Sequence, residues 1–243
     1  MVGREYASQV LELARTAVDE QYAQICRIAS EIFKSMKEGG VLHVFGCGHS
    51  HMFMEECFYR AGGLVPVNPL FETSTMLHEG AVKSSLIERM TGYAPLVLGN
   101  YDVRAGEVML IFSTSGINAF PIEMALAARE KGLITVGFTS MNYRDAASRH
   151  PSGEKLCEVV DFVINNHASY GDAMVSYPNS GVNAVPGSTI LSMTLLNTII
   201  AEVLAYYDQA GLPLPIFISG NVEGGLERNK ALIDQYKSRV KAL

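Results

Sequence analysis

Apolar residues recur every three or four positions over the first part of the chain, which is the spacing of the buried face of an amphipathic helix. The pattern runs from Arg4 to Lys37 and ends at Gly39-Gly40, where two glycines stop a helix. It predicts one long helix or two stacked ones. The apolar positions are Val10, Leu13, Ala14, Ala17, Val18, Ile25, Ile28, Ala29, Ile32, Phe33 and Met36.

After residue 40 the pattern changes to short apolar runs that alternate with helical stretches. The runs are continuously apolar, as expected for strands that helices cover on both faces. This alternation predicts an α/β fold with a doubly wound, mainly parallel sheet, whose strand-end loops share the edge where ligands bind. The predicted strands are Val41–Phe45, Leu64–Val67, Glu107–Phe112, Leu133–Phe138 and Val159–Ile164, and the predicted helices are Ser50–Ala61, Asn118–Lys131, Ser188–Tyr207 and a charged one near Glu223–Val240.

No domain boundary interrupts this pattern. We therefore expect one domain over residues 1–243, with residues 1–38 as an N-terminal helical extension and residues 220–243 as a C-terminal helix. The least regular regions are Asn68–Gly106, Met141–Lys155 and Tyr177–Gly187. Loops of this length are often functional in compact domains.

Composition narrows the function classes. A net charge of −6, with acidic residues spread along the chain, gives no electrostatic footprint for nucleic acid. The four cysteines form no C-x-x-C pair, and residues 1–30 lack the apolar core of a signal peptide, so a cytoplasmic protein is expected. Ile190–Tyr207 approaches the length of a membrane span, but its polar residues favour a buried core helix, and no membrane association is expected.

Two loops at predicted strand ends carry candidate chemistry. In Gly46-Cys47-Gly48-His49-Ser50-His51 the glycines allow a sharp turn close to a ligand, although a dinucleotide fingerprint would need glycine at residue 51. A tight turn without a ligand is the alternative interpretation. In the second loop, Ser113-Thr114-Ser115-Gly116 precedes a helix that starts near Asn118. Small residues at a helix N-terminus bind phosphate without a lysine, whereas plain helix capping by Ser115 is the alternative.

The two loops resemble the sugar isomerase (SIS) domain family. Gly46 to Ser50 is similar to its G-x-G-x-S turn, and Ile111 to Gly116 is similar to its S-x-S-G phosphosugar signature. The similarity covers about residues 35–210. The segments Ala125–Gly132 and Thr135–Thr139 extend the similarity to this signature. Three further segments resemble a bacterial subfamily of SIS proteins: His150-Pro151-Ser152-Gly153, Gly171-Asp172-Ala173 and Asn221-Val222-Glu223-Gly224-Gly225.

The resemblance implies a flavodoxin-like three-layer αβα sandwich that forms a homodimer or larger homo-oligomer, with a phosphorylated sugar as ligand. The residues that it places around this ligand are Gly48, His49, Ser50, Ser113, Thr114, Ser115, Asn118, Thr139 and Ser188. Ser188 enters through Gly187-Ser188-Thr189, which is similar to a helix start in the N-acetylmuramic acid 6-phosphate etherases. The zinc site of the phosphoheptose isomerases is not carried over, because Glu56 and Tyr59 stand at its positions. No metal or cofactor is expected.

Isomerisation and etherase-type elimination both begin when a base removes the proton next to a carbonyl. Glu79 is the leading candidate for this base, with His78 as an acid partner or orienting group. The alternative interpretation is that both residues lie in a loop and are exposed to solvent. His49 and His51 are alternative bases; at spacing i, i+2 they do not share a helix face, so a metal pair would depend on the loop geometry.

Two function classes remain. The first is an isomerase or lyase that acts on a phosphosugar, and the second is a non-catalytic phosphosugar sensor. A buried Glu79 that points into the pocket would favour the enzyme. A solvent-facing Glu79, with no other carboxylate near the serines, would favour the sensor.

Overall fold

A computed structural model describes residues 1–243, and its core is a five-stranded sheet in the order β2-β1-β3-β4-β5. All four strand pairs are parallel. This order is that of the doubly wound flavodoxin-like sheets. Their ligands bind between β1 and β3, where the order in which successive strands are added to the sheet reverses. The predicted α/β class with a parallel sheet is therefore confirmed. The strands are β1 (Leu42–Gly46), β2 (Val67–Pro69), β3 (Val108–Phe112), β4 (Ile134–Thr139) and β5 (Phe162–Asn165).

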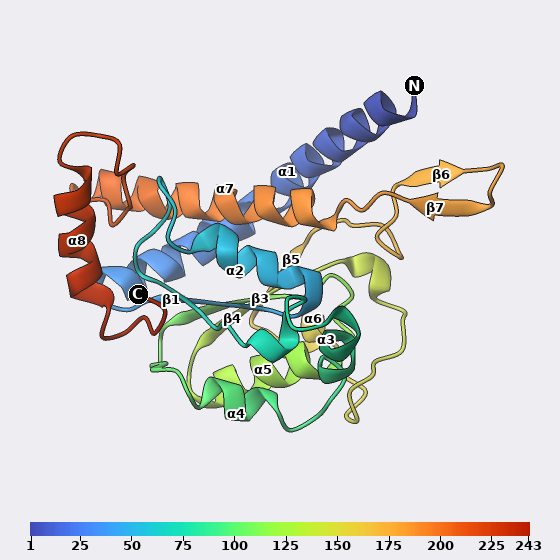
Figure 1. The fold of residues 1–243 in the computed structure, drawn as a ribbon, viewed down its shortest axis with the longest axis horizontal. Helices are drawn as coiled ribbons and strands as arrows, with labels where there is room; N and C mark the ends of the chain where they lie inside the picture. The colour runs from blue at the N-terminus through green and yellow to red at the C-terminus, as the bar shows by residue number, and fades with distance from the viewer.

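Helices cover both faces of the sheet (Figure 1). On one side α1 (Val2–Lys37), a single long helix, packs along α7 (Ser188–Gln209) and against β3 and β5. On the other side α5 (Ala119–Glu130) packs against β3 and β4 and is flanked by α4 and α6. The remaining helices are η1 (Gly48–His51), α2 (Met52–Cys57), η2 (Thr73–Thr75), α3 (Ala81–Ile87), α4 (Ala94–Leu98), η3 (Met141–Tyr143), α6 (Leu156–Val159) and α8 (Gly225–Tyr236).

Three predicted elements were wrong in their bounds, among them the strand Val159–Ile164, whose first residue ends α6 and whose strand β5 begins only at Phe162. The apolar run at Leu64–Val67 is not the second strand: Leu64 forms an isolated antiparallel bridge with Ile216, and β2 begins only at Val67. Residue 65 donates its backbone N–H to the carbonyl of Pro215, 2.8 Å away. The first two residues of the predicted strand are therefore paired with the segment that precedes α8 and not with a strand of the sheet. The predicted helix Ser50–Ala61 is a 3₁₀ turn followed by α2, which ends at Cys57.

A hairpin of β6 (Val175–Tyr177) and β7 (Val182–Ala184) was not predicted. Its strands are three residues long and mostly exposed, so they lack the apolar alternation that marks a strand in a sequence. The hairpin projects from the same end of the molecule as the N-terminal part of α1 (Figure 1).

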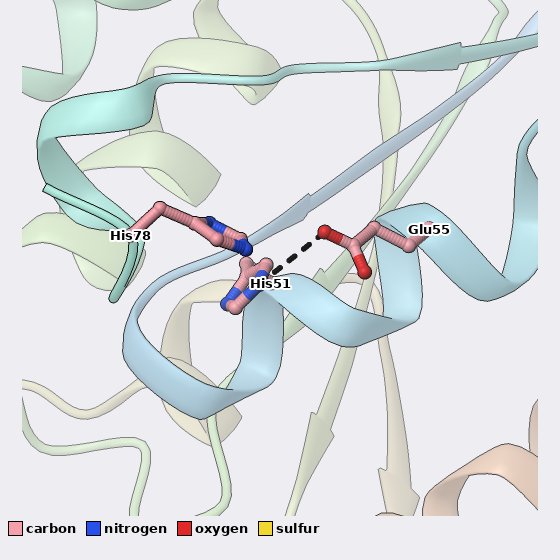
Figure 2. A group of neighbouring side chains, drawn as sticks. All are labelled: His51, Glu55 and His78. Carbon is pink, nitrogen blue, oxygen red and sulfur yellow. Dashed lines mark ion pairs between the residues drawn. The ribbon is translucent and has the colours of Figure 1, made fainter.

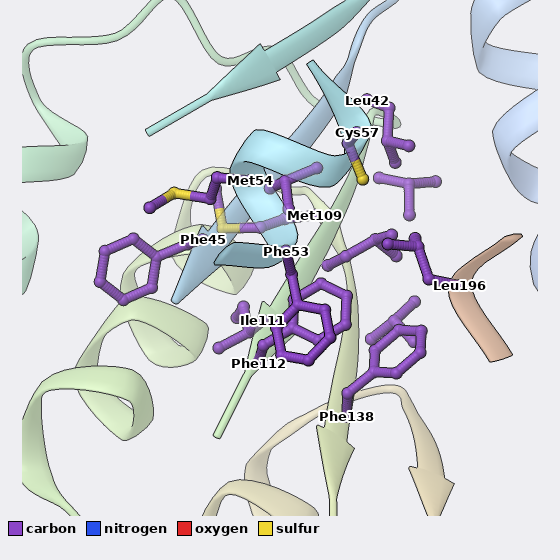
Figure 3. Packing of buried hydrophobic residues seen from close by; sticks show 14 of the residues in the cluster. Leu42, Phe45, Phe53, Met54, Cys57, Met109, Ile111, Phe112, Phe138 and Leu196 are labelled. Carbon is purple, nitrogen blue, oxygen red and sulfur yellow. The ribbon is translucent and has the colours of Figure 1, made fainter. Parts of the chain in front are cut away.

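Aromatic packing ties the first loop to the ends of the neighbouring strands. The ring of Phe53 in α2 stacks on Phe112 of β3, and Phe112 stacks on Phe138 of β4, each pair with centroids 4.2 Å apart (Figure 3). Burial of one such side chain stabilises the fold by about 1.5–3 kcal/mol. The stack therefore holds α2, and the loop that precedes it, at the ends of β3 and β4.

Helix α7 is long and apolar enough to cross a membrane by length and composition. In this fold its apolar side chains contribute to the main core, among them Leu195, Leu196 and Ile199, each with no exposed surface. This matches the sequence-based interpretation of the segment as a core helix.

Candidate functional site

The loops after β1 and β3 lie side by side because the two strands are paired in register to their last residues. Gly46, the end of β1, is opposite Phe112, the end of β3. A Cβ atom at Gly46 would collide with the backbone carbonyl of Ser50, so the chain can fold back into η1 only with glycine there. The two predicted ligand loops thus meet at the β1/β3 switch point.

The shape of the second loop is fixed by hydrogen bonds to β4. The N–H of Ser113 donates to the carbonyl of Phe138, and the N–H of Ser140 donates to the carbonyl of Thr114. The hydroxyl of Thr139 also donates to Thr114, at 3.2 Å, and the Ser113 hydroxyl accepts from the N–H of Gly116 at 3.3 Å. The Thr139 hydroxyl therefore holds the loop, whereas the O–H of Ser113 has no acceptor within the chain.

Other groups of this loop have no partner in the chain. The backbone N–H groups of Thr114, Ser115, Ile117 and Asn118 donate to no atom of the protein, and neither do the hydroxyls of Thr114 and Ser115. They stand at the N-terminus of the twelve-residue helix α5, where the helix dipole adds positive potential. Such a concentration of unmet donors is an anion-binding arrangement.

A cation lies at the same helix end. Nη1 of Arg149 donates to Oδ1 of Asn118 at 2.7 Å, and the Arg149 backbone N–H donates to the carbonyl of Ile117. Sequence reasoning missed this residue, since it lies in the irregular stretch after β4, far from the serine loop in the chain. The serine loop itself contains no basic residue, and Arg149 places a positive charge beside it.

A second missed residue is Glu88, just after α3. Its Oε2 lies 3.9 Å from the position that a Cβ at Gly48 would take, so the carboxyl reaches the first loop. Its backbone carbonyl accepts from the N–H of Phe120 in α5 at 3.0 Å. Burial raises the pKa of Glu88, against the lowering effects of a hydrogen bond from Asn118 and the charge of Arg149. A carboxyl with a raised pKa beside both loops has the properties of a general base.

Glu79 has different surroundings. Its side chain is 45% exposed and pairs with Lys83 one helical turn away. Hydrogen bonds from Lys83 and then from Thr73 lower the pKa of Glu79. These properties suit a solvated surface carboxylate rather than a proton acceptor in a dry pocket, and the structure brings a different carboxyl, Glu88, to the serine loops.

His78 contacts the first loop at His51. The two imidazole rings meet edge to face with centroids 4.9 Å apart, and His51 in turn lies 3.4 Å from Glu55 (Nε2 to Oε1; Figure 2). His49 is exposed, and Ser50 is partly exposed with a hydroxyl that makes no hydrogen bond in the chain.

Ser188 is the first residue of α7, and its side chain is hydrogen-bonded within the chain. Its hydroxyl donates to Oδ2 of Asp172 at 2.6 Å, and the backbone N–H groups of Gly187 and Ser188 donate to Oδ1. Asp172 thus caps the start of α7. The structure gives Ser188 no hydrogen bond to the serine loops.

Comparison with protein families gives this arrangement a name. The family described as "SIS domain" matches residues 5–140, more than half of the chain and including both loops. The chain belongs to the SIS domain family.

The closely similar relatives span nearly the whole chain. The UPF0309 protein of Geobacillus thermodenitrificans (strain NG80-2) is 43% identical over 240 residues, covering 98% of this chain and 96% of its own length. The UPF0309 protein of Thermoanaerobacter pseudethanolicus is 43% identical over 244 residues, with 98% and 99% covered. The chain therefore shares nearly its full length with the UPF0309 proteins.

Solved structures share the SIS fold at low sequence identity. Phosphoheptose isomerase GmhA from Neisseria gonorrhoeae superposes with a TM-score of 0.55 at 16% identity, covering 82% of this chain and 95% of its own. The Vibrio vulnificus NanR protein, complexed with ManNAc-6P, has a TM-score of 0.50 at 12% identity, covering 96% of this chain and 71% of its own. At these identities the likeness establishes the fold of this SIS domain.

Proposed function

We propose that this protein binds a phosphorylated sugar at the β1/β3 edge and acts on it as an isomerase or lyase that abstracts the proton next to the carbonyl. The observation that carries the proposal is the set of unmet N–H and hydroxyl donors at Thr114 and Ser115, at the N-terminus of α5 and beside Arg149. A phosphate dianion would satisfy these donors together. Gly48, His49 and Ser50 of the first loop and Asn118 of the second are the further proposed contacts of this ligand.

The ligands named for two structures with the same fold support a sugar phosphate as the ligand class. One SIS-fold neighbour is described as a phosphoheptose isomerase, and another was solved with N-acetylmannosamine 6-phosphate. One is an enzyme and the other a complex with a sugar phosphate. The shared feature is a sugar phosphate, which is also what the unmet donors of this chain favour.

In this proposal Glu88 is the general base. It reaches the first loop at Gly48 and the second loop through Asn118, and burial raises its pKa towards the range where a carboxylate accepts a proton effectively. His78, near His51 at the rim, is the proposed acid partner. Glu79, the base expected from the sequence, is replaced in this role because it is paired with Lys83 at the surface.

A sensor without turnover is the second candidate. It is favoured by the solvent-facing Glu79, which is paired with Lys83 at the surface. Glu88 is the observation that favours the enzyme instead. Turnover of a bound sugar phosphate by the wild type and its loss in Glu88→Gln, with binding retained, distinguishes the two functions.

The first experiment is a thermal-shift screen with hexose, heptose and amino-sugar phosphates, N-acetylmannosamine 6-phosphate among them. Each phosphate is measured beside its unphosphorylated sugar. A ligand present at 100 times its Kd stabilises the folded state by about 2.7 kcal/mol. Stabilisation by a phosphorylated sugar alone supports the proposal, and equal shifts for sugar and phosphate, or none across the panel, contradict it.

The proposed assembly is a homodimer in which the projecting half of α1 is covered. Leu11 of α1 is 66% exposed, and Val182 of the neighbouring hairpin is 54% exposed. Exposed apolar side chains of this size are typical of an interface. Light scattering tests this assembly: a mass of two or more chains agrees with it, and a monomer contradicts it.

A further inference from the structure

Three metal-ligating side chains converge beside the first loop. His51, Glu55 and His78 each offer a ligand atom, and these atoms all lie within 4.8 Å of one another. His51 ends the 3₁₀ turn η1, Glu55 lies one turn further on in α2, and His78 comes from the segment after η2 (Figure 2). No other group of three such side chains exists in the chain.

The backbone fixes which nitrogen of His51 is available. Nδ1 of this buried ring is hydrogen-bonded to the carbonyl oxygen of Gly48, and since a carbonyl only accepts, Nδ1 must carry the proton. In the neutral ring, Nε2 then presents its lone pair to Oε1 of Glu55. Two lone pairs that face each other repel unless a cation lies between them. A histidine held through its other nitrogen by a backbone carbonyl is also the usual arrangement of a metal ligand.

The spacing suits a small transition-metal ion. Two ligands at about 2.0–2.1 Å from a tetrahedral zinc lie roughly 3.3 Å apart. Nε2 of His51 and Oε1 of Glu55 are separated by 3.4 Å. The exposed ring of His78 meets that of His51 with centroids 4.9 Å apart, and a ligand nitrogen of His78 lies within 4.8 Å of both other ligand atoms.

We propose that His51, Glu55 and His78 bind a divalent first-row transition-metal ion, with Zn²⁺ as the representative ion. Two imidazoles and one carboxylate favour such ions over Mg²⁺, which takes mainly oxygen ligands. Three protein ligands leave a coordination position open, and the exposure of Glu55 and His78 gives the ion a path from solvent. The site does not depend on the phosphate-binding donors, but it uses His78, so in the metal-bound protein His78 is a ligand and not the proposed acid partner.

Other histidine–carboxylate pairs in the chain lack this arrangement. His167 lies 3.2 Å from Glu20, and His150 lies 3.7 Å from Glu123, but neither pair has a third ligand. These pairs are ordinary contacts between a titratable ring and an acid. An ion pair of the same kind, with protonated His51 on Glu55 and no metal, is the competing interpretation that the experiment must separate.

The experiment titrates the full-length, tag-free protein with Zn²⁺ in a calorimeter and with Co²⁺ by visible absorption, in the absence of sugar. The wild type is expected to bind one ion per chain, and Co²⁺ is expected to gain the visible band of a nitrogen-coordinated ion. His78→Gln and Glu55→Gln are each expected to weaken Zn²⁺ binding by at least about tenfold. Both changed side chains are exposed, so these variants are expected to fold, which circular dichroism checks.

His167→Gln is the matched control, because it removes a histidine that also lies beside a carboxylate. Loss of binding in both cluster variants, with binding kept in the control, supports the site. No binding by the wild type, unchanged binding in both cluster variants, or loss in only one of them overturns the three-ligand site. Mg²⁺, titrated in the same way, is expected to give no comparable binding.

Discussion

The two ends of the parallel strands each carry a glutamate beside an arginine, the buried Glu107 at one end and the half-buried Glu88 at the other, yet the ends differ in how their polar groups are hydrogen-bonded. At the edge where the strands begin, Glu107 has its partners within the chain. At the edge where the strands end, the carboxyl of Glu88 lies beside donors that have none. Polar groups that are hydrogen-bonded within the chain stabilise the fold, whereas polar groups without a partner in the chain are available to a ligand.

Glu107 illustrates the first edge. Its Oε2 accepts from Nε2 of His43 at 2.8 Å, and its Oε1 accepts from Arg239 at 2.6 Å and from the backbone N–H of Val41 at 3.0 Å. Burial alone would raise the pKa of Glu107, but the hydrogen bonds from His43 and Arg239 outweigh it and lower the pKa to about 2. The network joins the starts of β1 and β3 to the C-terminal segment after α8. A surface hollow at this end is lined in part by Arg104, Glu107 and Arg239, whose side chains already have partners within the chain.

Glu88 illustrates the second edge. Burial is the largest influence on its carboxyl and raises its pKa, while Asn118 and Arg149 only partly offset that effect. Burial therefore disfavours the ionised form of this carboxyl, at a cost in stability when it is charged. Such a cost is common at functional sites and is the reason the edges respond differently to the same substitution.

Glu107→Gln is expected to cause the largest effect. Removing the charge leaves Arg239 and His43 without their buried partner, which costs about 3–5 kcal/mol of the free energy of unfolding. Urea denaturation measures this loss, with the exposed Asp234→Asn as a control that is expected to unfold like the wild type. A loss below about 1 kcal/mol would show that the network does not stabilise this edge.

The pH dependence of that difference sharpens the comparison. Because the folded pKa of Glu107 is lowered to about 2, its contribution is present above the pKa of the unfolded chain and is lost as the pH falls through 2. The difference in unfolding free energy between the wild type and Glu107→Gln should therefore shrink between pH 5 and pH 2. A difference that stays constant over this window would contradict the assigned pairing.

Ser115→Ala is expected to weaken binding of the sugar phosphate selected by the thermal-shift screen by about 1–3 kcal/mol, the range for a charge-assisted hydrogen bond. Calorimetry measures the change. Ser238→Ala, an exposed serine at the opposite edge, is the control and should bind like the wild type. Unchanged affinity in Ser115→Ala would remove this hydroxyl from the phosphate site.

Glu88→Gln is expected to have the smallest effect on stability, and of the opposite sign to Glu107→Gln. Because the folded pKa of Glu88 is raised, its favourable contribution exists at low pH and is lost as the pH rises through that pKa. A neutral amide avoids this loss, so at neutral pH the variant should gain about 0.5–1 kcal/mol. Urea denaturation at neutral pH that shows a clear destabilisation instead would place Glu88 with Glu107 as a stabilising residue.

The sheet and the positions of its loops could be predicted from the sequence because they depend on local patterns. Continuous apolar runs define β1, β3 and β4, and the glycines and serines that follow them mark the strand ends. Strand β2 was misplaced because the equally apolar residues before it bind the returning chain near Pro215. No local pattern distinguishes these two partners.

The candidate site was only partly predictable, because its remaining members meet through tertiary contacts. Glu88 reaches the serine loop through a bond between its carbonyl and Phe120, and Arg149 reaches it from the loop after β4. His78 comes to His51 from a different segment. The sequence offered Glu79 as the base, whereas the structure leaves its side chain 45% exposed and paired with Lys83.

The central claim is that the unmet donors at the end of β3 bind the phosphate of a sugar. The most direct test follows the backbone amide resonances of the protein by NMR while the selected sugar phosphate, and then its unphosphorylated sugar, is added. We predict that the amides of Thr114, Ser115 and Ile117 shift most, and only with the phosphate, while those around Glu107 and Arg239 do not move. Shifts confined to the opposite edge, or equal shifts with the unphosphorylated sugar, would contradict the claim.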